Sequence, residues 1–225
     1  MGKGVEIEAC VNDMTRLNWR ELCVAHPAVI VKHPMGTKVM FDQLNRNNDK
    51  RDVSVVLIYG PTGTGKTNYA MSQKDVFKKD GMDQWFDGYN GESTLLIDDF
   101  AGSCSRITLS FLLTLLDRYP VNLPVKRSFE MCKAKWIIVT SNIHPRMWYD
   151  YSKREEHYRA LARRFHEVWW FTPEHKCKLV PKNFFENWYE YCNEKVVFIE
   201  DSQGTQPLTP YSSGDMDMPS LIWEY

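Results

Sequence analysis

The spacing of apolar residues predicts a bundle of short helices in the first part of the chain. Between residues 5 and 45, apolar side chains recur at helical spacing. Asn18, Pro27 and Pro34 interrupt this pattern, and residues of these types favour helix boundaries. The stretch 45–52 consists only of Asn, Asp, Lys and Arg, a composition typical of a linker.

From residue 53 onwards, short apolar runs alternate with stretches of helical spacing. The apolar runs predict buried strands over Val55–Tyr59, Thr94–Ile97, Lys135–Thr140 and Glu167–Phe171. Helices are predicted over 67–72, 109–119 and 153–164, and a hairpin over 121–135. Because strands and helices alternate, we expect an α/β fold with a central, mostly parallel sheet.

The end of the chain has a different composition. Aromatic residues continue to about residue 199, and the sequence from Asp201 is rich in Gly, Ser, Pro and Asp apart from an apolar patch at 221–223. We therefore expect a C-terminal extension over 176–225 that is flexible from about 201. The expected division is a helical domain at 1–50, an α/β domain at 51–175 and this extension.

Composition narrows the class of protein without fixing its activity. The chain has 225 residues, of which 43% are hydrophobic and 25% are charged, as in globular proteins. No apolar run approaches the length of a membrane span, so we expect an intracellular protein with no membrane partner. The net charge of −1 argues against binding nucleic acid through a generally basic surface. Any nucleic-acid contact must be a local basic patch.

A phosphate-binding pattern, G-x-x-x-x-G-K-[ST], follows the first predicted strand and matches at every fixed position. Its residues are Gly60, Pro61, Thr62, Gly63, Thr64, Gly65, Lys66 and Thr67. Glycines let backbone N–H groups approach phosphate, the lysine reaches the β- and γ-oxygens, and the hydroxyl ligates Mg²⁺. The following helix directs its positive N-terminus at the phosphates. We therefore predict ATP and Mg²⁺ as cofactors.

Two acidic residues, Asp98 and Asp99, come directly after the second predicted strand. Ligands of open α/β sheets bind at the carboxyl ends of strands, so both carboxylates are candidates for the same site. We predict that Asp98 holds the water shell of Mg²⁺ and that Asp99 orients or deprotonates the attacking water. Two acidic residues that cap the next helix are the alternative, and the phosphate loop upstream favours the catalytic interpretation.

Further polar candidates lie at Asn142 and at the pair Arg163 and Arg164. Asn142 follows a predicted central strand, where its amide can reach the γ-phosphate or position water, although asparagine is also a common turn former. The arginines can be a solvated helix end. In an oligomeric ATPase, an arginine presented to the neighbour's γ-phosphate stabilises the transition state.

These elements, in this order, resemble the superfamily 3 helicase domain, which implies an AAA+-like P-loop ATPase fold. More closely, the chain resembles the replication-initiator (Rep) proteins of circular single-stranded DNA viruses, the circovirus-like group. The resemblance covers 53–171 and rests on the segments 60–67, 85–89, 97–100, 116–120, 139–142, 148–149 and 160–164. The first 50 or so residues are similar to the family's helical oligomerisation segment only in character.

The resemblance implies a DNA helicase of rolling-circle replication that forms a hexameric ring, moves 3′→5′ on single-stranded DNA and works in the host cell nucleus. It implies that Asn142 is the sensor and that Arg163 or Arg164 acts across the subunit boundary; which of the two does so stays open. The family's hairpin grips DNA inside the ring. The residues in this position are Lys126, Arg127, Lys133 and Lys135, with Lys126 nearest the tip. Ordinary solvated lysines are the alternative.

The chain departs from the family in one respect. No His-hydrophobe-His metal motif is present, so we expect neither nicking nor joining of DNA. A monomeric P-loop kinase of nucleotides or small molecules is an alternative function. An interaction scaffold stabilised by ATP is another, against which the intact Asp99 argues.

Overall fold

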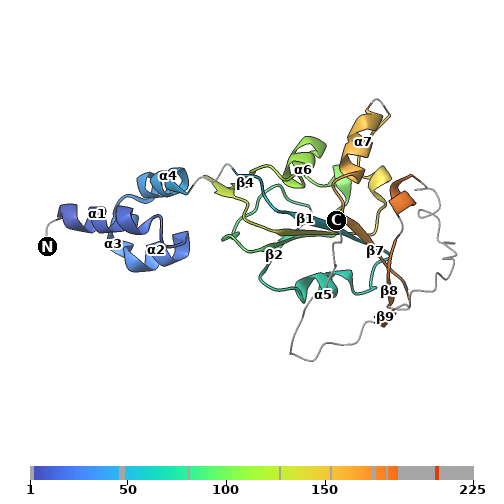
Figure 1. Ribbon diagram of the computed structural model, residues 1–225, viewed down its shortest axis with the longest axis horizontal. Helices are drawn as coiled ribbons and strands as arrows, with labels where there is room; N and C mark the ends of the chain where they lie inside the picture. The colour runs from blue at the N-terminus through green and yellow to red at the C-terminus, as the bar shows by residue number, and fades with distance from the viewer. Residues whose placement is uncertain are drawn as a thin grey trace.

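Within residues 3–45, four helices form a unit at the amino-terminal end of the molecule (Figure 1). The computed structural model describes residues 3–45, 49–80, 82–126, 128–152, 154–173, 176–180, 182–186 and 206–207. The helices are α1 (Lys3–Asp13), α2 (Trp19–Ala25), α3 (Pro27–Lys32) and α4 (Pro34–Leu44). They pack around Cys10, Met14, Leu22 and Phe41.

The breaks between these helices follow from single residues. Asn18 and Glu21 form a reciprocal capping box at the start of α2, with both hydrogen bonds at 2.9 Å. Pro27 and Pro34 each occupy the first helical position, where the missing N–H group costs no hydrogen bond. The predicted boundaries are confirmed.

In the described part of the chain, one sheet contains seven strands in the order β2-β3-β6-β1-β7-β8-β9. The strands are β1 (Ser54–Tyr59), β2 (Val76–Asp80), β3 (Thr94–Asp98), β6 (Trp136–Ser141), β7 (Glu167–Phe171), β8 (Lys176–Leu179) and β9 (Gln206–Pro207). The first five are parallel, whereas β8 and β9 are antiparallel additions at one edge. The expected α/β fold with a mostly parallel sheet is confirmed.

Helices cover both faces of the sheet. In Figure 1, α6 (Leu109–Leu115) and α7 (Glu155–Ala162) lie on one side and α5 (Lys66–Met71) lies on the other. Alternate residues of β1 serve the two faces: Leu57 belongs to the larger hydrophobic cluster and Ile58 to the smaller one. The hairpin β4 (Asn122–Val125) and β5 (Ser128–Met131) forms a separate two-stranded sheet, as predicted.

Three strands of this sheet were not predicted: β2 and β8, whose apolar pattern is interrupted by lysines, and the two-residue β9. In β2, with the sequence Val-Phe-Lys-Lys-Asp, Lys79 is 2% exposed and lies over the ring of Phe86 at 5.0 Å. In β8, lysines alternate with Cys177 and Leu179. The sheet therefore continues past residue 175, the expected domain boundary, and Phe184 beyond it is fully buried in the main core.

Among the described residues, an ion pair ties the hairpin to the helical unit. The Lys38 ammonium on α4 lies 2.8 Å from a carboxylate oxygen of Glu130 on β5, and the two side chains are 13% and 25% exposed. Lys38 also pairs with Asp42 on its own helix. The linker that follows the helices is anchored by Arg51, which donates to the carbonyl of Tyr119 at 2.8 Å and to that of Leu115 at 2.6 Å.

Helix α6 ends at Leu115, earlier than the predicted end at Tyr119. Pro120 disfavours a helical conformation of the preceding residue. Arg164 reaches the same end of α6: it donates to the carbonyl of Leu113 at 2.7 Å and to the carboxylate of Asp117 at 2.7 Å. Arginine side chains therefore satisfy carbonyls that a continued helix would have bonded.

No helix in the described ranges is long and apolar enough to cross a lipid bilayer. Arg127 and the expected flexible tail from residue 201, apart from 206–207, lie outside the described residues.

The contacts of Arg164 predict a role in stability. Arg164→Ala removes a charged pair whose side chains are 22% and 28% exposed, together with hydrogen bonds to backbone carbonyls. We expect the free energy of unfolding in urea to fall by about 1–3 kcal/mol. The adjacent Arg163→Ala is the matched control, expected within about 0.5 kcal/mol of the parent protein. Equal stability of the two variants would contradict this assignment.

Candidate nucleotide-binding site

The predicted phosphate loop joins the carboxyl end of β1 to the start of α5, as its sequence context required. Gly60 has a φ of 155°, and a Cβ atom there would lie 2.2 Å from the carbonyl oxygen of Phe171. Gly65 has a φ of 90° and precedes the first residue of α5. Only glycine suits both positions, one because of space and the other because of conformation.

Lys66 points back into the loop. The whole residue is 5% exposed. Its ammonium donates to the carbonyls of Gly60 at 2.9 Å and Pro61 at 2.7 Å. Burial lowers the pKa of Lys66, and the nearby carboxylates of Asp99 and Asp98 oppose that shift. The loop therefore holds a buried cation, which is the charge that a phosphate group needs there.

Asp98 lies at the end of β3 and gathers donors from several elements. One carboxylate oxygen accepts from the hydroxyls of Thr67 at 2.7 Å and Thr140 at 2.8 Å. The other lies 2.8 Å from the ammonium of Lys78. Burial works to raise the pKa of Asp98, but hydrogen bonds from these three side chains and the charge of Lys78 lower it overall. Asp98 is therefore ionised and fixed in position.

Asp99 has a different environment from Asp98. It is exposed, and its φ of 49° lies in the left-handed region, which is uncommon for residues other than glycine. Its N–H group donates to the Thr140 hydroxyl at 2.8 Å, which holds the turn. Asp98 is thus held by hydrogen-bond donors, whereas Asp99 faces solvent beside the phosphate loop.

Asn142 also reaches the loop. It directly follows β6, which is paired in parallel with β1 so that Ser141 lies opposite Tyr59. The Asn142 amide donates to the Thr62 hydroxyl at 3.1 Å. The structure therefore brings together the phosphate loop, Asp98, Asp99 and Asn142 at the carboxyl edge of the sheet.

The two candidate arginines lie at the opposite edge. They precede β7, whose first residue Glu167 is opposite Val56, near the start of β1. Arg164 is committed to α6 and Asp117. Arg163 is exposed, and its guanidinium makes no hydrogen bond or ion pair to any residue in the described part of the chain.

The candidate DNA-binding lysines are not gathered in one place. Lys126 is at the hairpin tip with its side chain 70% exposed, and its ammonium lies 3.2 Å from the carboxylate of Asp87. Lys133 and Lys135 are exposed but follow β5, at the base of the hairpin.

Comparison with known proteins agrees with this site. A family model described as RNA helicase matches residues 56–143, which contain the loop, both aspartates and Asn142. The replication-associated protein of beak and feather disease virus is 34% identical over 159 residues, covering 71% of this chain and 53% of that protein. That of porcine circovirus 1 is 34% identical over 137 residues, covering 59% and 43%.

The chain is a homologue of the circovirus replication-associated proteins. It carries a superfamily 3 helicase domain, a helicase-type ATPase. The chain spans about half the length of the relatives that it matches.

Lys78 and Thr140 are site residues of this homologue that sequence reasoning missed. Lys78 belongs to the unpredicted strand β2, where it lies opposite Leu96 on the neighbouring β3. Thr140 is the last residue of a predicted strand and looked like part of an apolar run. The order of the strands across the sheet, which brings β2 and β6 to either side of β3, is the signal that was lacking.

The Lys78–Asp98 pair predicts a stability that depends on pH. Because the folded-state pKa of Asp98 lies below its ordinary 3.8, its ionised form favours folding above about pH 4, and this contribution is lost as pH falls through the folded-state pKa. Lys78→Met should lower the free energy of unfolding by about 1–2 kcal/mol at pH 7, since Lys78 is partly exposed.

The difference between Lys78→Met and the parent protein should close as the pH falls below about 4. Urea unfolding over a pH series measures it, with Lys74→Met at an exposed position before β2 as the control. A difference that stays constant with pH would show that Lys78 stabilises through packing alone.

Proposed function

We propose that this chain is the ATP-driven motor of a viral rolling-circle replication initiator, an AAA+-like ring that moves 3′→5′ on single-stranded DNA. The observation that carries the proposal is the separation of the two halves of an ATPase site. The phosphate loop, the acids and Asn142 lie at the carboxyl edge of the sheet, whereas the available arginine lies at the amino edge.

The residues at the carboxyl edge suit ATP with Mg²⁺. The Thr67 hydroxyl and the Asp98 carboxylate, 2.7 Å apart, are oxygen ligands of the kind that Mg²⁺ takes, alone or through water. When bound, Mg²⁺ neutralises charge on the phosphate oxygens. Lys66 holds the β- and γ-phosphates, Asp99 orients or deprotonates the attacking water, and Asn142 contacts the γ-phosphate or positions that water.

Arg163 is the better candidate for the arginine that acts on a neighbour. Arg164 would have to leave Asp117 and the end of α6 to reach another subunit, at a cost to stability. Arg163 makes no such contact within the described chain. A strand of six residues separates it from its own loop by on the order of 15–20 Å. Its target must therefore be the nucleotide of a second subunit.

The helical unit supports assembly into a ring, which the family resemblance makes hexameric. Among the described residues, large apolar side chains are exposed on all four of its helices: Val5, Ile7, Val24, Val31, Met35, Val39, Met40 and Leu44. A cluster of exposed apolar side chains on so small a unit marks an interaction surface. A second copy of the same unit is the partner that a closed ring supplies.

Single-stranded DNA is the proposed substrate, and Lys126 is the first candidate contact. Its ion pair with Asp87 is exposed, so it contributes little and can be exchanged for a DNA phosphate. Hydrogen bonds from Lys126, first from its backbone N–H group, lower the pKa of Asp87. Six hairpins around a channel would concentrate positive charge that one subunit of net charge −1 lacks. The family resemblance implies that this motor works in the host cell nucleus.

Mixed rings test the arrangement across subunits. Arg163→Ala should abolish ATP hydrolysis, because such an arginine contributes about 10³–10⁵ in kcat. Lys66→Ala should also be inactive, since its loop cannot hold the phosphates. Mixing the two should restore ATPase activity, because Lys66→Ala subunits supply Arg163 to intact loops. A monomeric P-loop kinase would show no restoration, and neither would rings if Arg163 acted within its own subunit.

A salt series tests the DNA contact. Lys126→Ala should weaken single-stranded DNA binding and reduce the slope of log K against log salt, because fewer counterions are released. Basal ATPase activity should stay near that of the parent protein. Lys74→Ala, an exposed lysine outside the hairpin, controls for bulk charge. Equal DNA affinities of the two variants across the series would exclude the hairpin tip as the grip.

A further inference from the structure

The proposed function requires that Arg163 be held in position, and it leaves Arg146 without a role. We propose that Arg146 is a positioning residue that fixes α7 and thereby sets the placement of Arg163. This inference rests on the proposed function, since it assumes that Arg163 acts on a neighbour's nucleotide. It concerns the short segment between Asn142, at the nucleotide site, and α7, which ends next to Arg163.

The segment that carries Arg146 is held by several hydrogen bonds and by ring packing. The Ser141 hydroxyl accepts from the N–H group of Ile143 at 3.0 Å and from the indole of Trp148 at 3.2 Å, and that indole also donates to the carbonyl of Ile143 at 2.9 Å. His144 is 1% exposed and packs on Phe184, with ring centroids 4.4 Å apart. The N–H group of Arg146 donates to the His144 ring at 3.1 Å.

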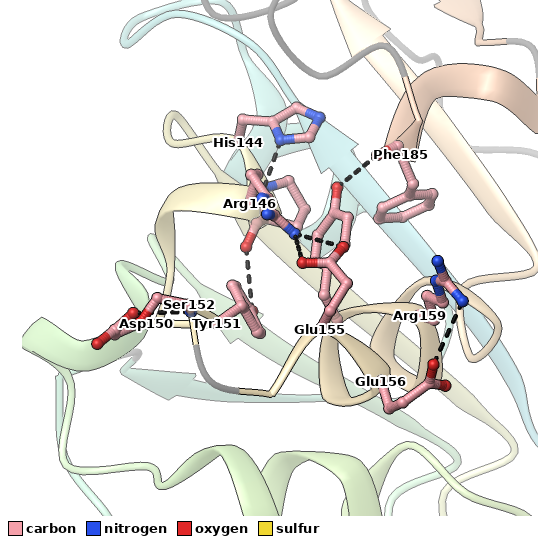
Figure 2. Close-up of polar contacts among 11 residues, drawn as sticks. His144, Arg146, Asp150, Tyr151, Ser152, Glu155, Glu156, Arg159 and Phe185 are labelled. Carbon is pink, nitrogen blue, oxygen red and sulfur yellow. Dashed lines mark hydrogen bonds and ion pairs between the residues drawn. The ribbon is translucent and has the colours of Figure 1, made fainter.

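From this base, Arg146 reaches the start of α7 (Figure 2). One guanidinium nitrogen lies 2.8 Å and 2.7 Å from the two carboxylate oxygens of Glu155, the first residue of the helix. The guanidinium also lies over the ring of Tyr158 at 4.7 Å and that of Tyr151 at 5.7 Å. A planar cation held by a carboxylate and by aromatic faces fixes direction as well as distance.

A short helix connects Glu155 and Tyr158, which Arg146 contacts, to Arg163. Tyr158 is itself anchored, because its hydroxyl donates to the carbonyl of Phe185 at 2.7 Å. Helix α7 has eight residues, about 12 Å at 1.5 Å per residue, and a helix of this length moves as one body. Arg163 follows its last residue directly.

Arg146 and Arg163 face the same space. Both line one open groove of about 630 Å³, together with Tyr158 and Ala162 from α7. The Arg146–Glu155 pair is 26% and 47% exposed, so its contribution to stability is small and its geometric effect is the more informative one. On the same helix, Arg159 and Glu156 pair at 3.2 Å with side chains 68% and 82% exposed, which provides a matched control.

Mixed rings distinguish a positioning role from a local one. If Arg146 sets the position of Arg163, then Arg146→Ala keeps an intact phosphate loop but displaces Arg163. The variant should therefore behave like Arg163→Ala. We expect kcat to fall about tenfold or more while the Kd for nucleotide stays within about twofold. Mixing with Lys66→Ala should restore activity, and mixing with Arg163→Ala should not. Restoration by neither partner would place the defect in the variant's own site and overturn the inference.

Glu155→Gln separates positioning from direct contact with the neighbour, and it replaces Arg146→Ala if that variant fails to fold. It should show the same loss and the same pattern of restoration. Full activity of Glu155→Gln would overturn the inference, because α7 would not need the pair. The control variants Arg159→Ala and Glu156→Gln should keep the kcat of the parent protein. A kcat of Arg146→Ala that matches theirs would also overturn the inference. If Arg163→Ala and Lys66→Ala fail to restore each other, the proposed function fails instead.

Discussion

The Asp98 carboxylate is the contact on which the geometry of the site depends. It is 6% exposed, and its three donors come from different elements: Thr67 from α5, Thr140 from β6 and Lys78 from β2. A buried carboxylate without donors would be protonated or would open the structure to water. Because each donor satisfies part of this charge, the surrounding strands and the phosphate loop share one position. The same Thr140 hydroxyl then holds the turn at Asp99.

Features fixed by local sequence could be predicted well. The phosphate loop, the helix breaks at Pro27 and Pro34, and the strands with unbroken apolar runs follow from neighbouring residues alone. Lys78 could not be found in this way, because a lysine in a charged strand has meaning only when the strand lies beside Asp98. Register and strand order supply that information, and neither is written in a short window of sequence.

Arg163 and Arg164 show the same limit more sharply. They are adjacent residues of the same type, so composition and motif could not separate them. Their roles differ because consecutive residues at a helix end point in different directions, about 100° apart around the axis. One side chain meets the end of α6, whereas the other lines an open groove. Tertiary contact, and not local preference, decides between them.

The Lys38–Glu130 pair limits the freedom of the hairpin. With side chains only 13% and 25% exposed, this pair is poorly screened by solvent; breaking it would cost Glu130 this partner, whereas Lys38 would keep its ion pair with Asp42. A displacement of the hairpin therefore also acts on α4. The Lys38–Glu130 pair therefore gives the amino-terminal unit a contact with the α/β part of the molecule that does not run through the linker at 45–52.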